Sequence, residues 1–539
     1  MSIMRDYPHY KTVEKHKIMD LTFNYFIKCN GPYLNCPTKC NRSIYNISPY
    51  NGNLIYPEYY SVKGSRQGPH LGFSNKAEYE RYFIRRGYAI VYANSLGTIG
   101  SDGCPTIGDE QEILAAKAVI DWLNDRAMAY DAKNKLINAE WASGKVGMIG
   151  LSYEGTIPNG VATTGVEGLE TIVPIGAISN WYDYYRANGA VVAPGGYQGD
   201  DADRLARGIL TRNNSEICQE CITQLTFDQD RKTGNYNDFW EARNYLNHVE
   251  NIKASVFVVH GLNDMNVKRK QFAKWWEQLT YYDIPRKLWL HQGGHIDPKI
   301  TGGYKWLKTL HRWFDYWLYS IDNGIMNESR VTIQRETMNW HHENDWPAEN
   351  VVDQTLFLCV DEHGKGALRT ENVVSKKTAS TFSDHPRKNA TMLIQDPEMT
   401  SPNRLSFLTT PLAQSVRLSG FPRISIEASV NKTSGTLTAL LVDYGPSDAT
   451  IVTRGWMNIE NIHSIRESEK LKTNTKYTFT WDLEPHDYIF SPSHQIGLVL
   501  MSSDFEYTLR PDTSIDITVF YSHSCIQLPL VTHKNILHK

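Results

Sequence analysis

The pattern with the clearest chemical meaning in this sequence is a serine in a glycine-flanked turn. Lys145–Gly150 is a short apolar run typical of a buried strand, and it leads directly into Leu151–Gly155. A serine on a sharp strand-to-helix turn presents its Oγ at the carboxyl edge of a sheet, where it can act as a nucleophile. The spacing is G-x-S-x-x-G, because Glu154 occupies the place of the second glycine in the common G-x-S-x-G pattern. The alternative interpretation is that Ser152 is only the N-cap of a helix.

Two further strand ends offer the base and the acid that a serine nucleophile needs. Asp264 follows the apolar run Ala254–His260, and His295 lies in a glycine-rich loop after Lys287–Leu290. Where a serine stands on such a turn, the triad follows in the order Ser, Asp, His. We expect His295 to take the Ser152 proton while Asp264 holds the imidazole in the required tautomer. Taken singly, the two residues fit a turn aspartate and a solvated loop histidine, but their order favours a triad.

A second histidine, His291, is the rival base. It lies closer to the strand end, where its side chain is expected to be packed, so we favour His295. The two histidines are four residues apart, a spacing that presents two zinc ligands when the segment is helical. The intervening Gly293-Gly294 argues against a helix there. We therefore discount zinc here, and a serine nucleophile needs neither a metal nor an organic cofactor.

An acyl-transfer site also needs two donors for the oxyanion of its tetrahedral intermediate. The backbone N–H of Tyr153, the residue after the serine, is one candidate. The hydroxyl of Tyr50, in a loop near the start of the chain, is the other. Beside Pro49, Tyr50 also fits a simple turn aromatic.

The elements around these residues predict an α/β fold. Buried strands that alternate with helices form βαβ units and a mostly parallel, doubly wound sheet. The strand pattern lapses over 183–250, which we interpret as a helical insertion, and residues 1–80 are irregular. The predicted strands are 87–93, 145–150, 171–178, 254–260 and 287–290, and the predicted helices are 110–124 and 304–318.

The character of the chain changes after about residue 340. Short β-branched and apolar runs recur at close spacing with turn residues between them, which is typical of an all-β sandwich or jelly roll. We predict an α/β-hydrolase domain over 1–340, with its insertion at about 183–250, and a β domain over 341–539. The β runs are 355–360, 423–429, 436–443, 477–482, 495–501 and 514–520.

The composition is that of a globular protein without a strongly charged partner. Of 539 residues, 41% are hydrophobic and 21% charged, and the net charge is −3. Such a balance excludes long disorder and provides no field for nucleic acid or anionic lipid. No run of apolar residues approaches a membrane span, and the first 17 residues lack the apolar core of a signal peptide. We expect a cytoplasmic protein that binds neither nucleic acid nor membrane.

The eight cysteines are too sparse for a disulfide scaffold. Cys29, Cys36 and Cys40 cluster near the start, but they lack the fourth ligand of a structural zinc site. Cys218 and Cys221 form a single C-x-x-C in a polar, helical stretch with no second pair. We expect ordinary reduced thiols.

Taken together, several segments resemble the X-prolyl dipeptidyl-peptidases, serine exopeptidases that release Xaa-Pro dipeptides from peptide N-termini. The similarity runs from about residue 80 to the C-terminus, with the Pro49-Tyr50 turn as an outlying match. Cocaine-esterase-like hydrolases and α-amino acid ester hydrolases share the architecture but are less similar over 160–200. The segments that carry the resemblance are 97–103, 118–124, 144–153, 162–172, 178–189, 259–264 and 454–469.

The resemblance implies a role for each candidate residue of the reaction centre. Ser152, Asp264 and His295 match the family's triad, and Tyr50 matches its oxyanion tyrosine. Many members carry a separate N-terminal domain, and their first sheet strands precede the Pro-Tyr loop. Only 48 residues precede Pro49 here, so we expect those strands to be shortened or replaced.

The resemblance also implies a substrate pocket. Trp181 and Tyr184 match aromatics that line the proline pocket, where flat rings pack well against a pyrrolidine. Asp200 occupies the place of the family's ammonium-binding Glu and is one methylene shorter, and Asn266 matches a further polar contact. The alternative interpretations are core packing for the two aromatics and a solvated acidic turn for Asp200 and Asp201.

These observations favour a serine aminopeptidase that cleaves after a proline in the second position, by way of an acyl-enzyme on Ser152. Its partners would be proline-containing peptides, and a homodimer is one assembly that it could form. The second hypothesis is an esterase or acylase with the same triad. The third is a hydrolase-like scaffold whose β domain binds carbohydrate or a partner, which the intact triad argues against.

Overall fold

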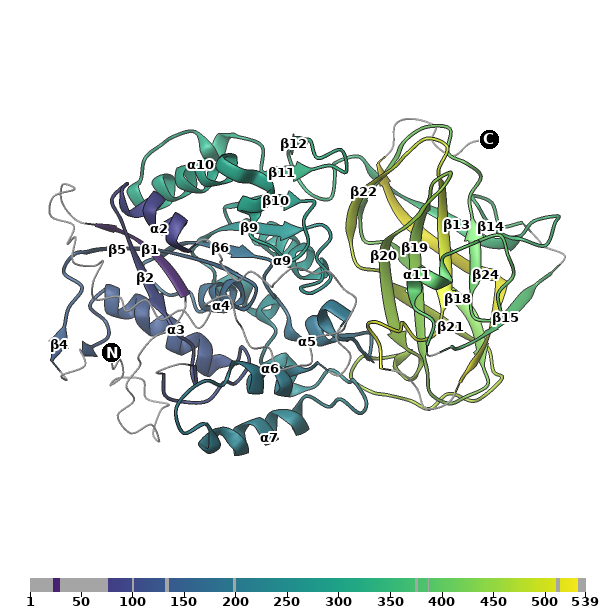
Figure 1. Ribbon diagram of the computed structural model, residues 1–539, viewed down its shortest axis with the longest axis horizontal. Coiled ribbons are helices and arrows are strands. Elements are labelled where there is room, and N and C mark those ends of the chain that lie inside the picture. The colour runs from purple at the N-terminus through teal and green to yellow at the C-terminus, as the bar shows by residue number, and fades with distance from the viewer. Residues whose placement is uncertain are drawn as a thin grey trace.

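The structure, a computed structural model, has an α/β lobe and a β-rich lobe side by side (Figure 1). It describes residues 23–29, 76–98, 101–130, 135–196, 200–373, 377–385, 387–509 and 514–531. Within these described ranges, the α/β lobe is built on an eight-stranded sheet, and the β-rich lobe on a twelve-stranded one.

The eight-stranded sheet has the order β12-β11-β10-β9-β6-β5-β1-β2. Strands β5, β6, β9, β10 and β11 run parallel to one another, so their carboxyl ends meet at one edge. The register pairs Leu151 with Ile175, and Ile175 with Val259, which brings the residues after these strands together. The strands are β1 (Phe23–Cys29), β2 (Tyr88–Ala93), β5 (Ala142–Leu151), β6 (Leu169–Ile175), β9 (Ser255–Gly261), β10 (Arg286–His291), β11 (Val331–Gln334) and β12 (Trp340–Glu343).

Helices cover both faces of this sheet, which is why its central strands read as continuous apolar runs. Every residue of β9 is buried, with Val256 and Val258 on one face and Phe257 and Val259 on the other. One face packs against α3 and α4, and the opposite face against α10 (Figure 1). The helices are α2 (Lys76–Ile84), α3 (Glu110–Leu123), α4 (Tyr153–Ala162), α9 (Lys270–Tyr281) and α10 (Pro298–Tyr319).

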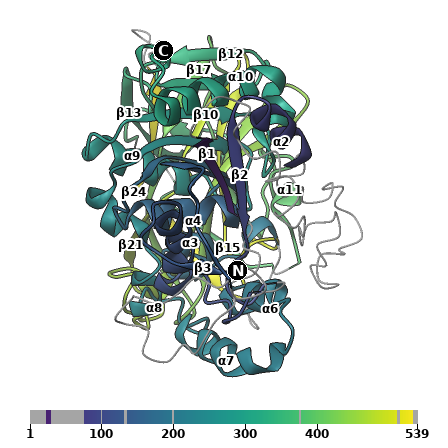
Figure 2. The same cartoon turned by 90° about the vertical axis from the view of Figure 1, so that its left-hand side faces the viewer.

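Between β6 and β9 the chain forms the predicted, mainly helical insertion. Figure 2 shows α6 and α7 together at one end of the lobe. Besides its helices the insertion contains one short antiparallel hairpin, β7–β8. Its elements are α5 (Trp181–Tyr185), β7 (Arg186–Ala187), β8 (Ala190–Val191), α6 (Ala202–Ile209), α7 (Gln219–Asp228) and α8 (Asp238–Glu241), with 3-10 turns at Pro194–Gly196, Ser215–Cys218 and Tyr245–Asn251.

The β-rich lobe encloses its own core of alternating inward side chains. In β18 every second residue is buried, which is the period of a strand with one solvated face. The jelly-roll arrangement stays a prediction. The strands are β13 (Val351–Val360), β14 (Gly366–Arg369), β15 (Ala379–Ser383), β16 (Leu405–Leu408), β17 (Val416–Gly420), β18 (Arg423–Val430), β19 (Thr436–Tyr444), β20 (Ala449–Asn458), β21 (Tyr477–Asp482), β22 (His486–Phe490), β23 (Gln495–Met501) and β24 (Asp516–Val531).

Three strands of the sheet, β1, β11 and β12, were not predicted from the sequence. Of these, β1 and β11 lie inside the sheet. Phe23–Cys29 forms β1, which lies between β5 and β2 and is antiparallel to both. Its seven residues include Asn24, Lys28 and Cys29 and have neither a clean alternation nor a continuous apolar run. The local pattern therefore predicts no strand there. Sheet pairing with two neighbours, rather than local pattern, establishes this strand.

The prediction that the thiols are reduced is wrong for two cysteines. Cys104 and Cys218 form a disulfide across 114 residues, which ties the loop before α3 to the start of α7. Cys221, Cys359 and Cys525 are free. The sequence analysis weighed Cys218 only against its neighbour Cys221, and a partner so distant in sequence leaves no local signal.

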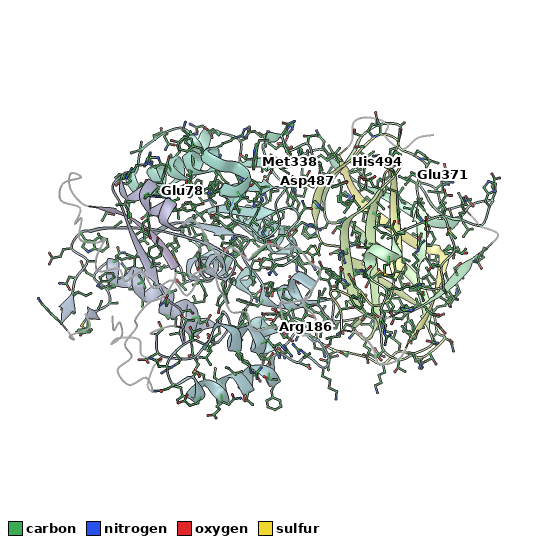
Figure 3. All side chains as sticks on the ribbon, viewed as in Figure 1. Glu78, Arg186, Met338, Glu371, Asp487 and His494 are labelled. Carbon is green, nitrogen blue, oxygen red and sulfur yellow. A yellow bond between two sulfur atoms is a disulfide. The ribbon has the colours of Figure 1, made fainter. Side chains whose placement is uncertain are left out.

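The two lobes are joined by a cluster of charged side chains. Arg335 and Arg417 both pair with Asp487 and Glu343, so that β12 is bound to β17 and β22. Figure 3 shows Asp487 at the boundary between the lobes. Its side chain is buried, so these pairs are protected from the screening that weakens exposed ones.

Candidate active site

The serine turn between β5 and α4 has the strained geometry of a nucleophile elbow. Ser152 has φ 64° and ψ −127°, and its N–H donates to the Ile175 carbonyl at 2.8 Å. A Cβ at Gly150 would lie 2.3 Å from the Glu154 carbonyl oxygen, and one at Gly155 would lie 2.4 Å from the Gly150 oxygen. The turn therefore needs glycine at these two positions, which accounts for the G-x-S-x-x-G spacing. Non-glycine residues with a positive φ, such as Ser152, concentrate at functional sites.

Asp264 and His295 form a hydrogen-bonded pair at the carboxyl edge of the sheet. Oδ2 of Asp264 lies 2.6 Å from Nδ1 of His295, while Oδ1 accepts the N–H groups of Asn266 and Val267 at 2.9 and 3.0 Å. Burial acts to raise the pKa of Asp264, but the His295 imidazole and these donors hold it below its usual value. Asp264 thus remains ionised and can orient the imidazole.

Gly176 brings this pair next to the serine. It follows Ile175, the residue that pairs with Leu151, and therefore lies beside Ser152. A Cβ added at Gly176 would lie 3.2 Å from Nδ1 of His295 and 3.4 Å from Oδ2 of Asp264. The His295 ring thus rests against the backbone next to Ser152, with a side chain 11% exposed.

Two other histidines, His260 and His291, lie near this pair, and both are buried. His291, the rival base, is 1% exposed and accepts the Gly293 N–H on Nδ1, and burial lowers its pKa to about 3. His260 bonds the Val267 carbonyl through Nε2 at 2.8 Å, 3.9 Å from Asp264 Oδ2, and burial lowers its pKa to about 4. Both are neutral at physiological pH.

Tyr153 follows the serine and opens α4, so its backbone N–H belongs to the first turn and has no helical acceptor. Its hydroxyl donates to the buried carboxylate of Glu112, which also accepts the N–H groups of Thr106 and Gly108 at 2.9 Å. Burial raises the pKa of Glu112. These bonds join the elbow to the loop before α3. Tyr50, the other predicted oxyanion donor, lies outside the described residues.

The predicted pocket aromatics lie together on α5. Trp181 is fully buried, makes edge contacts with Tyr153 and Tyr184, and donates from its indole nitrogen to the Tyr245 hydroxyl at 3.1 Å. Tyr184 is 8% exposed, and its hydroxyl donates to Asn266 Oδ1 at 2.8 Å. With Oδ1 so engaged, Asn266 has its amide N–H groups left to donate.

The two neighbouring aspartates of the insertion have different surroundings. Asp201 is fully buried, forms two 3.0 Å bonds with Arg186, pairs with Arg231 and caps α6. The solvated-turn interpretation is therefore wrong for Asp201. Asp200, the predicted ammonium ligand, is half-buried at the start of the same segment. Upstream, the Gly195 N–H donates to the Met265 carbonyl, which holds this segment beside the Asp264 loop.

The sequence analysis did not single out three residues that lie beside these groups: Glu112, His260, and Lys268, whose ammonium donates to the Tyr184 carbonyl. Glu112 lies within a predicted helix, and only its bond to Tyr153 connects it to the site. His260 ends a predicted strand, four residues before Asp264. Lys268 belongs to the basic run Lys268–Lys270, and such runs are normally solvated. A basic run directly after a triad loop was the one available signal.

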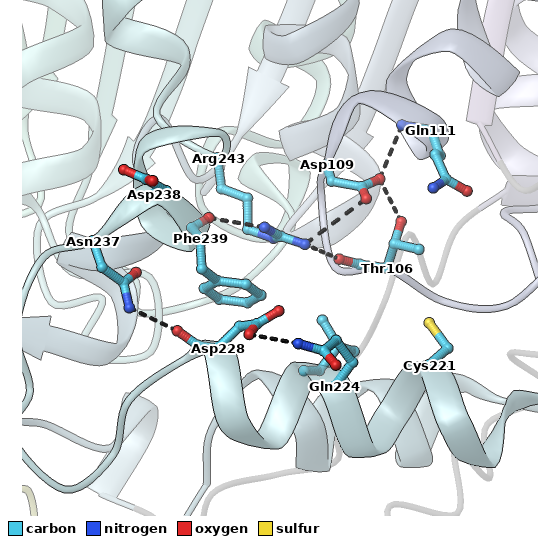
Figure 4. A pocket seen from close by; sticks show the side chains of 11 residues that line it. Thr106, Asp109, Gln111, Cys221, Gln224, Asp228, Asn237, Asp238, Phe239 and Arg243 are labelled. Carbon is cyan, nitrogen blue, oxygen red and sulfur yellow. Dashed lines mark hydrogen bonds and ion pairs between the residues drawn. The ribbon is translucent and has the colours of Figure 1, made fainter. Parts of the chain in front are cut away.

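A separate cavity of about 740 Å³ lies between α7, α8 and the loop before α3 (Figure 4). Arg243 donates to the carbonyls of Ile107, Phe239 and Thr106 beside it, and its guanidinium covers the Phe239 ring. None of Ser152, Asp264 and His295 is among the residues that line this cavity. It is therefore distinct from the Ser152 edge.

Within the described ranges, no group of three or more His, Cys, Asp or Glu side chains could hold a metal ion. None of the helices in that part of the chain has the length and apolar character to cross a membrane.

The elbow, the sheet order and the β-rich lobe define an α/β-hydrolase with an appended β domain, as predicted. An aminopeptidase from the marine sediment archaeon Thaumarchaeota archaeon superposes with a TM-score of 0.67 at 16% identity, covering 84% of this chain and 87% of that one. An α-amino acid ester hydrolase superposes with a TM-score of 0.63 at 18% identity, with the same coverage. At such identities the likeness concerns the fold alone.

Sequence comparison then identifies the family. The profile of the X-Pro dipeptidyl-peptidase (S15 family) matches residues 38–297, and that of the X-Pro dipeptidyl-peptidase C-terminal non-catalytic domain matches residues 323–539. A "Putative Xaa-Pro dipeptidyl-peptidase" of Bacillus anthracis is 49% identical over 491 residues, 90% of this chain and 81% of the relative. The Xaa-Pro dipeptidyl-peptidase of Ligilactobacillus salivarius is 33% identical over 505 residues, 83% of this chain and 62% of the relative. The chain therefore belongs to the S15 family of X-Pro dipeptidyl-peptidases and is a hydrolase.

Proposed function

We propose that this enzyme is a serine peptidase that releases Xaa-Pro dipeptides from the N-termini of peptides. The observation that carries the proposal is the hydrogen-bonded Asp264–His295 pair, which lies against Gly176 beside the strained Ser152 elbow. An ionised carboxylate, a histidine and a serine in this order supply all the groups that acyl transfer requires. Family membership supplies the substrate class.

In the proposed mechanism Ser152 Oγ attacks the carbonyl carbon of the substrate proline while His295 takes its proton. Asp264 stabilises the imidazolium that forms. The Tyr153 N–H donates to the oxyanion, and Tyr50 is the proposed second donor. His295 then protonates the leaving amine, and water releases the dipeptide from Ser152 by the same steps in reverse.

The pocket residues account for specificity in this proposal. Trp181 and Tyr184 offer aromatic faces to the proline ring, and the Asn266 amide donates to a substrate carbonyl. Asp200 is the proposed partner of the substrate's ammonium. The half-buried position of Asp200 supports this role, because a carboxylate removed from bulk water attracts a cation more strongly.

The test compares Ala-Pro-p-nitroanilide with its N-acetylated form. The free amine should be cleaved, the acetylated form should be cleaved at least about 100-fold less efficiently, and Ser152→Ala should abolish both activities. Asp200→Ala should raise KM for the free amine far more than for a simple aryl ester. Equal turnover of free and acetylated substrates would instead indicate the esterase or acylase alternative.

The remaining sequence-based expectations belong to the same proposal. They are a division into a catalytic domain over 1–340 and a jelly-roll-like domain over 341–539, a cytoplasmic location, and assembly as a homodimer. Size-exclusion chromatography with light scattering would test the last of these directly.

A further inference from the structure

Lys268 is a buried cation that contacts Tyr184, one of the proposed pocket residues. It lies four residues after Asp264, is fully buried, and donates from Nζ to the Tyr184 carbonyl at 2.6 Å. The same ammonium lies 5.5 Å from the centre of the Tyr184 ring, within the range of a cation–π contact. Lys268 therefore contacts both the backbone and the ring of one pocket residue.

The other end of Tyr184 is held by the same loop. Its hydroxyl donates to Asn266 Oδ1 at 2.8 Å, and the Asn266 N–H donates to Asp264 Oδ1 at 2.9 Å. Asn266 thus accepts a hydrogen bond from the Tyr184 hydroxyl, and Lys268 donates one to the Tyr184 carbonyl. We call these two contacts the Tyr184 clasp. Because the loop of the clasp also carries Asp264, the pocket wall and the triad are joined through it.

The surroundings of Lys268 show why its charge is unusual. The groups that act on it are Tyr184, Asp183 on α5, Lys270 on α9, Asp264 on its own loop, and Glu484 from the β-rich lobe. Two of these acids pair with Lys270 instead, at 3.7 Å to Glu484 and 4.0 Å to Asp183. Among the described residues no carboxylate lies within 4 Å of Lys268. A buried cation without a carboxylate partner costs stability.

We propose that Lys268 is a positioning residue that fixes Tyr184, and through it Asn266, in the geometry that binds the substrate's proline and carbonyl. This inference rests on the proposed function for the identity of the substrate. It assigns no contact between Lys268 and the reacting atoms.

If Lys268 acts through its charge, substrate binding should depend on its protonation state and therefore on pH. Burial lowers the pKa of Lys268 to about 8, so the charged, clasping form is present below that pH and is lost as pH rises through it. The substrate's own amine also titrates at about 8. Lys268→Arg separates the two effects, because a guanidinium stays charged in this range while the substrate amine titrates unchanged.

The test uses Lys268→Met, which keeps the length of the side chain and removes its charge. We expect KM for Ala-Pro-p-nitroanilide to rise about tenfold or more, with kcat within about threefold, because ground-state positioning is lost. Turnover of p-nitrophenyl acetate, which is too small to use the pocket, should change by less than about threefold. From pH 7 to 9, KM should rise less steeply for Lys268→Arg than for the wild type.

Lys287→Met is the matched control. Lys287 is also a buried lysine whose ammonium donates to backbone carbonyls, those of Ile325 and Ser329, and burial lowers its pKa to about 8 as well. It lies on β10, away from the clasp. This variant should lower the melting temperature comparably and leave KM unchanged.

A second readout does not depend on the substrate. In crystals of Lys268→Met the 2.8 Å contact between the Tyr184 hydroxyl and Asn266 Oδ1 should be lost, while Lys287→Met should keep it. A retained contact, equal kinetic effects of the two variants, or equal losses on anilide and ester would overturn the proposal. If the wild type fails to cleave the anilide, the proposed function is wrong, and the crystal comparison still decides whether Lys268 holds Tyr184.

Discussion

At the scale of single residues, the site depends on how closely His295 is seated. Its ring is hydrogen-bonded to Asp264 on one side and rests against Gly176, whose φ of 48° is left-handed. The absence of a Cβ at Gly176 leaves the room that the ring occupies. A displacement of about 1 Å in a catalytic group is enough to reduce turnover greatly.

Replacing Gly176 with alanine should therefore impair catalysis more than folding. A Cβ 3.2 Å from His295 Nδ1 would push the ring away, and we expect kcat to fall by about 10- to 100-fold. The left-handed backbone should cost about 1–2 kcal/mol. Gly324→Ala is the control, because Gly324 also has a positive φ but has open space around it. Comparable kcat values for the two variants would contradict the proposed seating of His295.

The buried histidines predict how stability depends on pH. His291 has a pKa of about 3 in the folded protein against 6.5 for the exposed group, so between these values the unfolded chain binds more protons. Stability must therefore fall as pH decreases through this window. From pH 7 to 4.5 this one residue should account for roughly 2–3 kcal/mol of the loss.

Urea unfolding of His291→Asn at pH 7 and pH 4.5 would measure this contribution. The difference in unfolding free energy between the two pH values should shrink by roughly 2–3 kcal/mol relative to the wild type. His463, which is exposed in the β-rich lobe, provides the control variant His463→Asn. An unchanged pH dependence in His291→Asn would show that this histidine is not held neutral.

At the scale of elements, the strand ends were predictable and their partners were not. The strands that carry Ser152, Asp264 and the His295 loop are short apolar runs bounded by turns, so burial on both faces is visible in the residues themselves. β1 lacks such a run, and the Cys104–Cys218 bond joins segments 114 residues apart. Pairings of this kind depend on where the fold brings two segments together.

The disulfide links α7 to the loop before α3, so its removal should lower the stability of the folded protein. Cys104→Ser should lower the unfolding free energy by roughly 2–4 kcal/mol, because a long closed loop is opened in the unfolded chain. A reductant should lower the melting temperature of the wild type to a similar extent. Cys221→Ser, which removes a free thiol three residues from Cys218, should melt like the wild type. If reduction leaves the wild-type melting temperature unchanged, the bond does not form in solution.

At the scale of the whole molecule, the β-rich lobe supports the loop that carries Asp264. Arg269 is buried where the lobes meet, and it donates to the Leu262 carbonyl of that loop, to the Pro485 carbonyl and to Thr453 Oγ1. The backbone N–H of its neighbour Lys270 donates to the Glu484 carboxylate. The β-rich lobe therefore supports the site, although it contributes no residue of the proposed triad.

Arg269→Met should accordingly damage stability and catalysis together. Three buried acceptors would lose their donor, at a cost of about 3–5 kcal/mol. Turnover of anilide and ester should fall by the same factor, since the whole Asp264 loop is displaced, in contrast to the KM effect expected for Lys268→Met. The control is Arg423→Met, which removes an exposed pair with Asp482 in the same lobe and should cost at most about 1 kcal/mol. A selective KM effect in Arg269→Met would argue against this view.

Burial and turn formation depend on residues that are neighbours in the chain, and they predicted most of the strand–helix order, the change to a β-rich lobe and the three residues of the proposed triad. Which side chains meet depends on the fold. It paired Asp201 with Arg186, joined Cys104 to Cys218, and brought Lys268 from a basic run to the back of Tyr184. Each of these contacts joins residues that are separated along the chain, and it forms only when the fold brings the two segments together.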